Sequence, residues 1–180
     1  MKKNILLLFL LLGFIAKSQN RSEVNTEFND KYKKSKTSKT GTLPKDELFK
    51  IKDSLEDELQ IKFVDEQTIV IHYFQYGSNC LIADFSEVDF SRVLNNIYRI
   101  SNSTEKRLNL KNYFVYNSNS FFESTLSKEE AFVLDKGFLK ESIFTEDENC
   151  EGFYLLKSDG RFLLYYGEDY FDDIENFLMK

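Results

Sequence analysis

The stretch IVIHYFQYGSNCLIADF, residues 69–85, decides the fold because it joins a buried strand to a turn that carries a cysteine. From Ile69 to Phe74 nearly every residue is β-branched or aromatic, so both faces of the strand are apolar. This pattern is typical of a central strand that is covered on both sides of a sheet. A small polar turn follows, with Cys80 at its end. We therefore expect Cys80 beyond the carboxyl end of a central strand.

Three further stretches have apolar residues at helical spacing, with acidic or capping residues near their start. They are PKDELFKIKDSLEDELQ (44–60), SEVDFSRVLNNIYRI (86–100) and DYFDDIENFL (169–178). In the second stretch, Ser86 and Asp89 have the spacing of a capping box. Each stretch predicts one helix.

Extended patterns lie between these helices. NYFVY (112–116) predicts a short strand, whereas SFFESTLSKEEAFVL (120–134) leaves helix and strand open. GFYLLKSDGRFLLYY (152–166) predicts a hairpin, because its central Ser-Asp-Gly turn tolerates positive φ. The order of the elements predicts an α/β fold in two layers with a mixed sheet.

The N-terminal stretch has the features of a secretory signal peptide. Two lysines precede an apolar run from Ile5 to Ala16, and Ser18 provides a small residue for cleavage. We therefore predict a signal peptide at 1–18 and an exported protein, either periplasmic or secreted. The apolar run is too short to span a bilayer and no later segment is long enough, so the chain is not expected to be membrane-spanning.

Charge divides the remaining chain unevenly. Residues 19–44 are polar, rich in lysine and without a period, which predicts a disordered basic linker. Residues 46–180 contain 27 Asp/Glu and 14 Lys/Arg, a net charge of −13. A domain this acidic is a poor nucleic-acid binder, because attraction to phosphate supplies most of that affinity.

The chain resembles a thioredoxin-like domain, of the kind found in exported bacterial thiol-disulfide oxidoreductases. TIVIHYFQYGSNC (68–80) looks like the strand and active-site turn, and FYLLKSDGRFLLYYG (153–167) looks like the closing hairpin. YFDDIENFL (170–178) is similar to the terminal helix. The resemblance covers residues 61–180 and implies a thioredoxin-like domain at 45–180, with a mixed central sheet and flanking helices.

The active-site motif departs from that family. Where the family has Cys-x-x-Cys, this chain reads Cys80-Leu81-Ile82-Ala83, and Glu151 stands near the position of the family's cis-proline. Dithiol chemistry needs one thiolate to attack and a second to release the mixed disulfide. The turn alone therefore cannot run that cycle.

The resemblance also implies that Cys150, the second cysteine, lies against the active-site turn and close to Cys80. Three alternatives stay open: a static disulfide, as is common in exported proteins, two separate thiols, or redox chemistry at Cys80. In the redox alternative Cys150 is the partner cysteine. No Lys or Arg lies within ten residues of Cys80, and acids such as Asp84 and Glu87 raise the pKa of a nearby thiol.

Other candidate residues are few. His72 is the only histidine, and we expect it to be a packed core residue rather than a catalytic base. The acidic loop TEDENCEG (145–152) lacks the spacing of a calcium site, so a solvated loop is expected there. We predict no metal site and no cofactor. The pair Tyr165-Tyr166 is the one local cluster that suggests binding.

The leading hypothesis is an exported thioredoxin-like protein that lacks the dithiol motif and serves as a binding or structural module. The alternative is a thiol-disulfide or peroxide-linked redox protein that uses Cys80 with Cys150. The sequence thus leaves open whether the protein is an enzyme. A protein partner is possible, and the sequence names no substrate or ligand.

Overall fold

The computed structural model of the protein describes residues 24–64, 66–168 and 170–179. The signal peptide predicted at 1–18 lies outside these residues and stays a prediction. Among the described helices, none combines the length and the apolar character that crossing a membrane requires.

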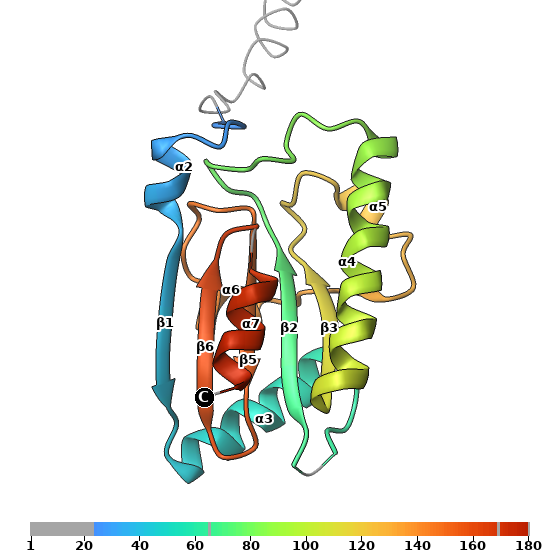
Figure 1. Cartoon of the computed structure of the whole chain (residues 1–180). Helices are drawn as coiled ribbons and strands as arrows, with labels where there is room; N and C mark the ends of the chain where they lie inside the picture. The colour runs from blue at the N-terminus through green and yellow to red at the C-terminus, as the bar shows by residue number, and fades with distance from the viewer. Residues whose placement is uncertain (1–23, 65, 169, 180) are drawn as a thin grey trace, which may run out of the picture.

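The described residues form a six-stranded mixed sheet (Figure 1). In spatial order its strands are β1 (Thr37–Thr42), β6 (Arg161–Tyr166), β5 (Glu151–Leu156), β2 (Thr68–Phe74), β3 (Leu110–Tyr116) and β4 (Phe132–Leu134). Strands β2, β3 and β4 run parallel to one another, whereas β5 is antiparallel to both β2 and β6. The predicted mixed sheet is therefore confirmed.

Helices cover both faces of this sheet. They are α2 (Asp30–Ser35), α3 (Lys45–Leu59), α4 (Glu87–Leu108), α5 (Glu123–Leu126), α6 (Phe138–Ser142) and α7 (Phe171–Leu178). Figure 1 shows α4 and α7 on one face, while α3 and α6 lie behind the sheet. The two-layer prediction is thus wrong in one respect, because the sheet is the middle one of three layers.

Strand β2 is central because its side chains are apolar on both faces, as predicted. Ile69, Ile71 and Tyr73 pack in the cluster that contains the α3 and α6 side chains. Val70 packs with residues of α7, and Phe74 packs with residues of α4. Full burial of such side chains stabilises a fold by roughly 1.5–3 kcal/mol each.

The predicted hairpin joins β2 directly. His72 of β2 lies opposite Phe153 of β5, and β5 continues through the turn into β6. Gly160 has φ +90, a left-handed conformation that L side chains rarely adopt, so glycine is needed at this position. The chain order from β2 is therefore a β2–α4–β3 unit, then α5, β4 and α6, and finally the β5–β6 hairpin and α7.

Two elements are longer or more complex than predicted. Helix α4 continues past residue 100 to Leu108, where the buried small residues Ser101 and Thr104 take the place of an apolar stripe. Its N-terminus is as predicted, because the Ser86 side chain accepts a hydrogen bond from the backbone N–H of Asp89. Segment 120–134, for which the sequence left helix and strand open, contains the short helix α5 followed by strand β4.

The linker predicted at 19–44 is wrong for the part that the structure describes, residues 24–44. Helix α2 and strand β1 lie there, and β1 pairs with β6 from Thr37 to Thr42. Tyr32 of α2 is completely buried. Strand β1 lacks an apolar pattern because it is an edge strand with exposed side chains, so its main-chain pairing leaves no signal in the sequence.

Candidate functional site

Cys80 and Cys150 form a disulfide, with an S–S distance of 2.07 Å and Cα atoms 5.2 Å apart. Strand β2 leads to Cys80, and Cys150 directly precedes β5, the antiparallel neighbour of β2. The backbone N–H of Gln75 donates to the carbonyl of Cys150 at 2.9 Å, which extends this pairing to the cysteine. The pairing implied by the thioredoxin resemblance is confirmed, and the bridge pins the hairpin to the central strand.

The turn before Cys80 packs its backbone against the segment that carries Cys150. A Cβ atom at Gly77 would lie 2.3 Å from the carbonyl carbon of Asn149, so glycine is required for this approach. The backbone N–H of Asn79 donates to the carbonyl of Glu148 at 2.8 Å. These contacts set the short distance between the two cysteine backbones.

The N-terminal segment, which we define as residues 24–42, packs against the turn that carries Cys80. Asn25 exchanges two backbone hydrogen bonds with the turn: its N–H donates to Ser78, and its carbonyl accepts from Cys80, both at 2.9 Å. Val24 packs against the hydrophobic cluster that includes both cysteines. Cys80 and Cys150 are 0% and 2% exposed, so a thiol in solution cannot reach the sulfur atoms in this fold.

Glu168 lies beside the bridge, although no sequence pattern marks it as a site residue. Its Oε1 atom is 3.0 Å from the Cys150 sulfur, and the backbone N–H of Leu81 donates to both carboxylate oxygens at 2.8 and 3.1 Å. Burial raises the pKa of Glu168 to about 7. Its backbone N–H donates to the Tyr32 hydroxyl at 3.0 Å. Nothing in the sequence spacing connects residue 168 to either cysteine.

A second buried carboxyl, that of Glu151, neighbours Glu168. Glu151 is the first residue of β5 and is only 3% exposed. Burial, and then the negative charge of Glu168, raise the pKa of Glu151 well above its usual range. The prediction of a solvated loop is therefore wrong for Glu151, although Glu146 and Glu148 of that loop are exposed.

The carboxylates of the acidic loop (145–152) make separate contacts and do not form one cluster. Glu146 accepts a hydrogen bond from the Thr37 hydroxyl at 3.0 Å, and Asp147 forms an ion pair with Lys140. In the part of the chain that the structure describes, the one group of metal-ligating side chains is Cys80, Cys150 and Glu168.

His72 is buried in a polar network, as expected for a core histidine. Its Nδ1 atom is 2.8 Å from the Tyr170 hydroxyl, and Nε2 is 2.9 Å from Oδ1 of Asn112. Because Oδ1 only accepts hydrogen bonds, Nε2 carries the proton and Nδ1 accepts from Tyr170. The ring stacks on Phe114 with centroids 4.8 Å apart. Burial lowers the pKa of His72 to about 4.

This lowered pKa predicts a loss of stability in acid. Unfolded His72 gains a proton below pH 6.5, whereas the folded residue gains it only near pH 4, so falling pH favours the unfolded state. We expect about 3 kcal/mol to be lost across this window through His72. The measurement is urea unfolding at several pH values for the wild type and for His72→Gln, which removes this titration. Parallel stability curves for the two proteins would contradict the prediction.

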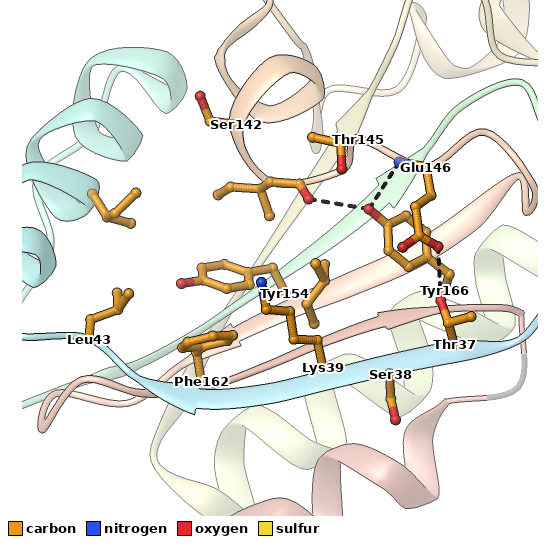
Figure 2. A pocket seen from close by; sticks show the side chains of 13 residues that line it. Thr37, Ser38, Lys39, Leu43, Ser142, Thr145, Glu146, Tyr154, Phe162 and Tyr166 are labelled. Carbon is orange, nitrogen blue, oxygen red and sulfur yellow. Dashed lines mark hydrogen bonds between the residues drawn. The ribbon is translucent and has the colours of Figure 1, made fainter.

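A cavity of about 290 Å³ lies on the face of the sheet that α3 and α6 cover, between these two helices and strands β1, β6 and β5 (Figure 2). It exists because the sheet extends to β1, beyond the cover that α3 and α6 provide. Ile51, Phe162 and Leu164 give it apolar walls and are only partly buried. Tyr166 also lines the cavity, whereas Tyr165 packs on the opposite face, so one member of the predicted tyrosine pair belongs to it.

Several polar groups that line the cavity have no hydrogen-bond partner in the described part of the chain, among them the Tyr154 hydroxyl and the Lys39 ammonium. The Tyr166 hydroxyl is satisfied, since it donates to the Ile143 carbonyl at 3.2 Å and accepts from the Glu146 N–H at 3.3 Å. Figure 2 draws no hydrogen bond at the Tyr154 hydroxyl or at the Lys39 ammonium. Within the described residues neither group has a hydrogen-bond or ion-pair partner, and burial alone raises the pKa of Tyr154.

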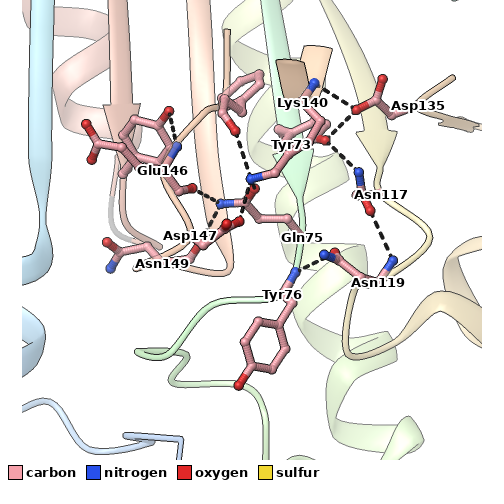
Figure 3. A network of polar contacts seen from close by, with 12 residues as sticks. Tyr73, Gln75, Tyr76, Asn117, Asn119, Asp135, Lys140, Glu146, Asp147 and Asn149 are labelled. Carbon is pink, nitrogen blue, oxygen red and sulfur yellow. Dashed lines mark hydrogen bonds and ion pairs between the residues drawn. The ribbon is translucent and has the colours of Figure 1, made fainter. Parts of the chain in front are cut away.

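A polar network fixes the loop that leads to Cys150 (Figure 3). The Lys140 ammonium donates to Oε1 of Gln75 and to the Phe144 carbonyl, both at 3.1 Å, and pairs with Asp147. Gln75 in turn donates to the Asn149 carbonyl at 2.9 Å. Because these bonds tie the loop to the end of β2, the network positions the disulfide rather than a ligand.

The chain was compared with protein-family models, with curated proteins and with solved structures, and it matches none of them.

Proposed function

We propose that this protein is an exported, non-catalytic binding module with a thioredoxin-like fold, and that it holds a small ligand in the cavity beside β1. Several features support the fold assignment. A strand–helix–strand unit precedes an antiparallel hairpin and a final helix, and β2 lies between its parallel partner β3 and the hairpin strand β5. Cys80 follows β2, at the position that the resemblance gives to the active-site turn. The predicted signal peptide supports export.

The burial of the disulfide supports a non-catalytic role. Exchange requires a thiolate to approach one sulfur along the S–S bond. Both cysteines are buried, the N-terminal segment is hydrogen-bonded to the turn that carries Cys80, and no Lys or Arg stands within ten residues of Cys80 to stabilise a thiolate. We therefore assign the bridge a structural role.

The observation that carries the proposal is the cavity, whose lining includes the unpartnered Lys39 ammonium and Tyr154 hydroxyl. A volume of about 290 Å³ is close to the lower limit of small-molecule pockets. The apolar walls suit a hydrocarbon or aromatic body, and Lys39 with the Tyr154 hydroxyl suits an anionic acceptor. These groups together favour a small carboxylic acid with an apolar body.

Binding of 3-phenylpropionate, followed by backbone amide NMR shifts, tests this proposal. We expect shifts around the cavity and about tenfold weaker binding in Lys39→Met, since a hydrogen bond to a charged group contributes roughly 1.5–3 kcal/mol. Tyr154→Phe should weaken binding less. Lys34→Met is the matched control, because Lys34 is an exposed lysine of α2 that does not line the cavity.

Two outcomes would contradict this proposal in different ways. If the neutral analogue 3-phenylpropanol binds as tightly as the acid, the cavity binds ligands but the carboxylate assignment fails. If neither compound shifts the amides of the cavity, the binding role fails.

A redox function is the second candidate, and the contact of Glu168 with the bridge favours it. An external thiolate that attacks Cys80 would break the S–S bond, and the leaving sulfur of Cys150 could take the proton of Glu168. Equilibration with glutathione buffers separates the two candidates. A potential above about −250 mV supports redox function, whereas we expect a value below about −300 mV for a structural bridge.

A further inference from the structure

Cys80, Cys150 and Glu168 bring two sulfur atoms and a carboxylate oxygen within 4.8 Å of one another. In the disulfide the sulfurs are bonded to each other and hold no metal. Before the bridge forms, however, every chain carries both cysteines as thiols. We propose that this dithiol form binds one Zn²⁺ through the two thiolates and the Glu168 carboxylate. The proposal is independent of the binding role of the cavity.

The distances suit zinc. Zinc bonds thiolate sulfur at roughly 2.3 Å and carboxylate oxygen at roughly 2.1 Å, so tetrahedral ligand atoms lie roughly 3.5–3.8 Å apart. The three atoms here already lie within 4.8 Å of one another. The sulfurs must separate from 2.07 Å, which side-chain rotation achieves while the Cα atoms stay about 5.2 Å apart. Binding forms two Zn–S bonds and one Zn–O bond, releases to solvent the two thiol protons and any proton that the Glu168 carboxyl carries, and transfers no electrons.

The surroundings also suit a cation with soft ligands. The Leu81 N–H donates to both oxygens of Glu168 and so orients the carboxylate toward the sulfurs. Among the described residues, no Lys or Arg forms an ion pair with Glu168 or with the neighbouring Glu151. Thiolate ligands select zinc over calcium or magnesium. Glu168 is partly exposed, so water can reach the fourth position from its side.

Cobalt spectroscopy of the full chain tests the proposal. The protein is reduced with a phosphine, freed of the reductant without air, and titrated with Co²⁺ and then with Zn²⁺. We expect one equivalent of Co²⁺ to produce the thiolate charge-transfer band and the intense visible bands of a tetrahedral site, and Zn²⁺ to abolish them. The disulfide form should give neither band.

Three variants assign the ligands. Cys80→Ser and Cys150→Ser should each weaken binding more than a hundredfold, and Glu168→Gln should weaken it at least tenfold. Glu148→Gln is the control, because this exposed acid lies in the same region without belonging to the cluster. Its affinity should equal that of the wild type.

Circular dichroism of each reduced protein, with and without Zn²⁺, shows whether a protein that fails to bind the metal is still folded. The proposal stands if the metal-bound dithiol form has the helix and strand content of the disulfide form. It is overturned if no cobalt bands appear, if Glu168→Gln binds like the wild type, or if metal binds only to a chain that stays unfolded.

Discussion

Replacement of both Cys80 and Cys150 by alanine is expected to lower the free energy of unfolding by about 4 kcal/mol. The bridge closes a loop between residues 70 positions apart, and its loss lets the unfolded chain sample many more conformations. Both cysteines are buried, so the variant also loses some packing in the cluster around α4. Urea unfolding of the double variant and the wild type measures the difference.

The reduced wild type is the control for this prediction. It should lose a similar amount of stability, because reduction removes the same constraint without changing the sequence. A loss below about 1 kcal/mol in both proteins would mean that the bridge is not structural. The redox candidate would then be favoured, because a labile bridge stabilises little.

Tyr32→Ala is expected to lower the free energy of unfolding by about 3–4 kcal/mol, because the truncation leaves a cavity in packed surroundings. Tyr32 is completely buried, and its hydroxyl accepts a hydrogen bond from the Glu168 N–H at 3.0 Å. The side chain therefore fixes the N-terminal segment to the residues beside the disulfide. Urea unfolding again provides the measurement.

Lys34→Ala is the matched control, because Lys34 lies in the same helix and is exposed. It should change stability by less than about 0.5 kcal/mol. If Tyr32→Ala also has so small an effect, the packing of residues 24–42 on the domain does not contribute to its stability. Tyr32→Ala should further speed the reduction of the bridge, because the segment that covers it is loosened.

The N-terminal segment contacts both the disulfide turn and the cavity. It closes the disulfide from one side through Asn25, and it supplies β1 and Lys39 to the cavity on the other face of the sheet. A domain that begins at residue 45 would lack both Asn25, which is bonded to the Cys80 turn, and β1, which pairs with β6, and this is the reason to test the full chain in every experiment above.

The sequence by itself determined the elements whose side chains repeat with a clear period. Strand β2 is apolar on both faces, α3 and α7 carry apolar residues at helical spacing, and the hairpin turn contains Gly160. In each of them the side chains that define the element are also the ones that the core buries, so local pattern and tertiary packing agree. The resemblance to thioredoxin-like domains added the pairing of Cys80 with Cys150.

Only the tertiary structure decided where the polar residues lie. Strand β1 is held by main-chain bonds to β6, and Tyr32 is a single buried residue without a period. Glu151 is buried and Glu168 is partly buried, although the sequence suggests surface acids, because their neighbours come from α2, β2 and the cysteine turn. The cavity forms because the sheet extends to β1, beyond the part that α3 and α6 cover. Such long-range contacts have no period along the chain, so sequence patterns cannot reveal them.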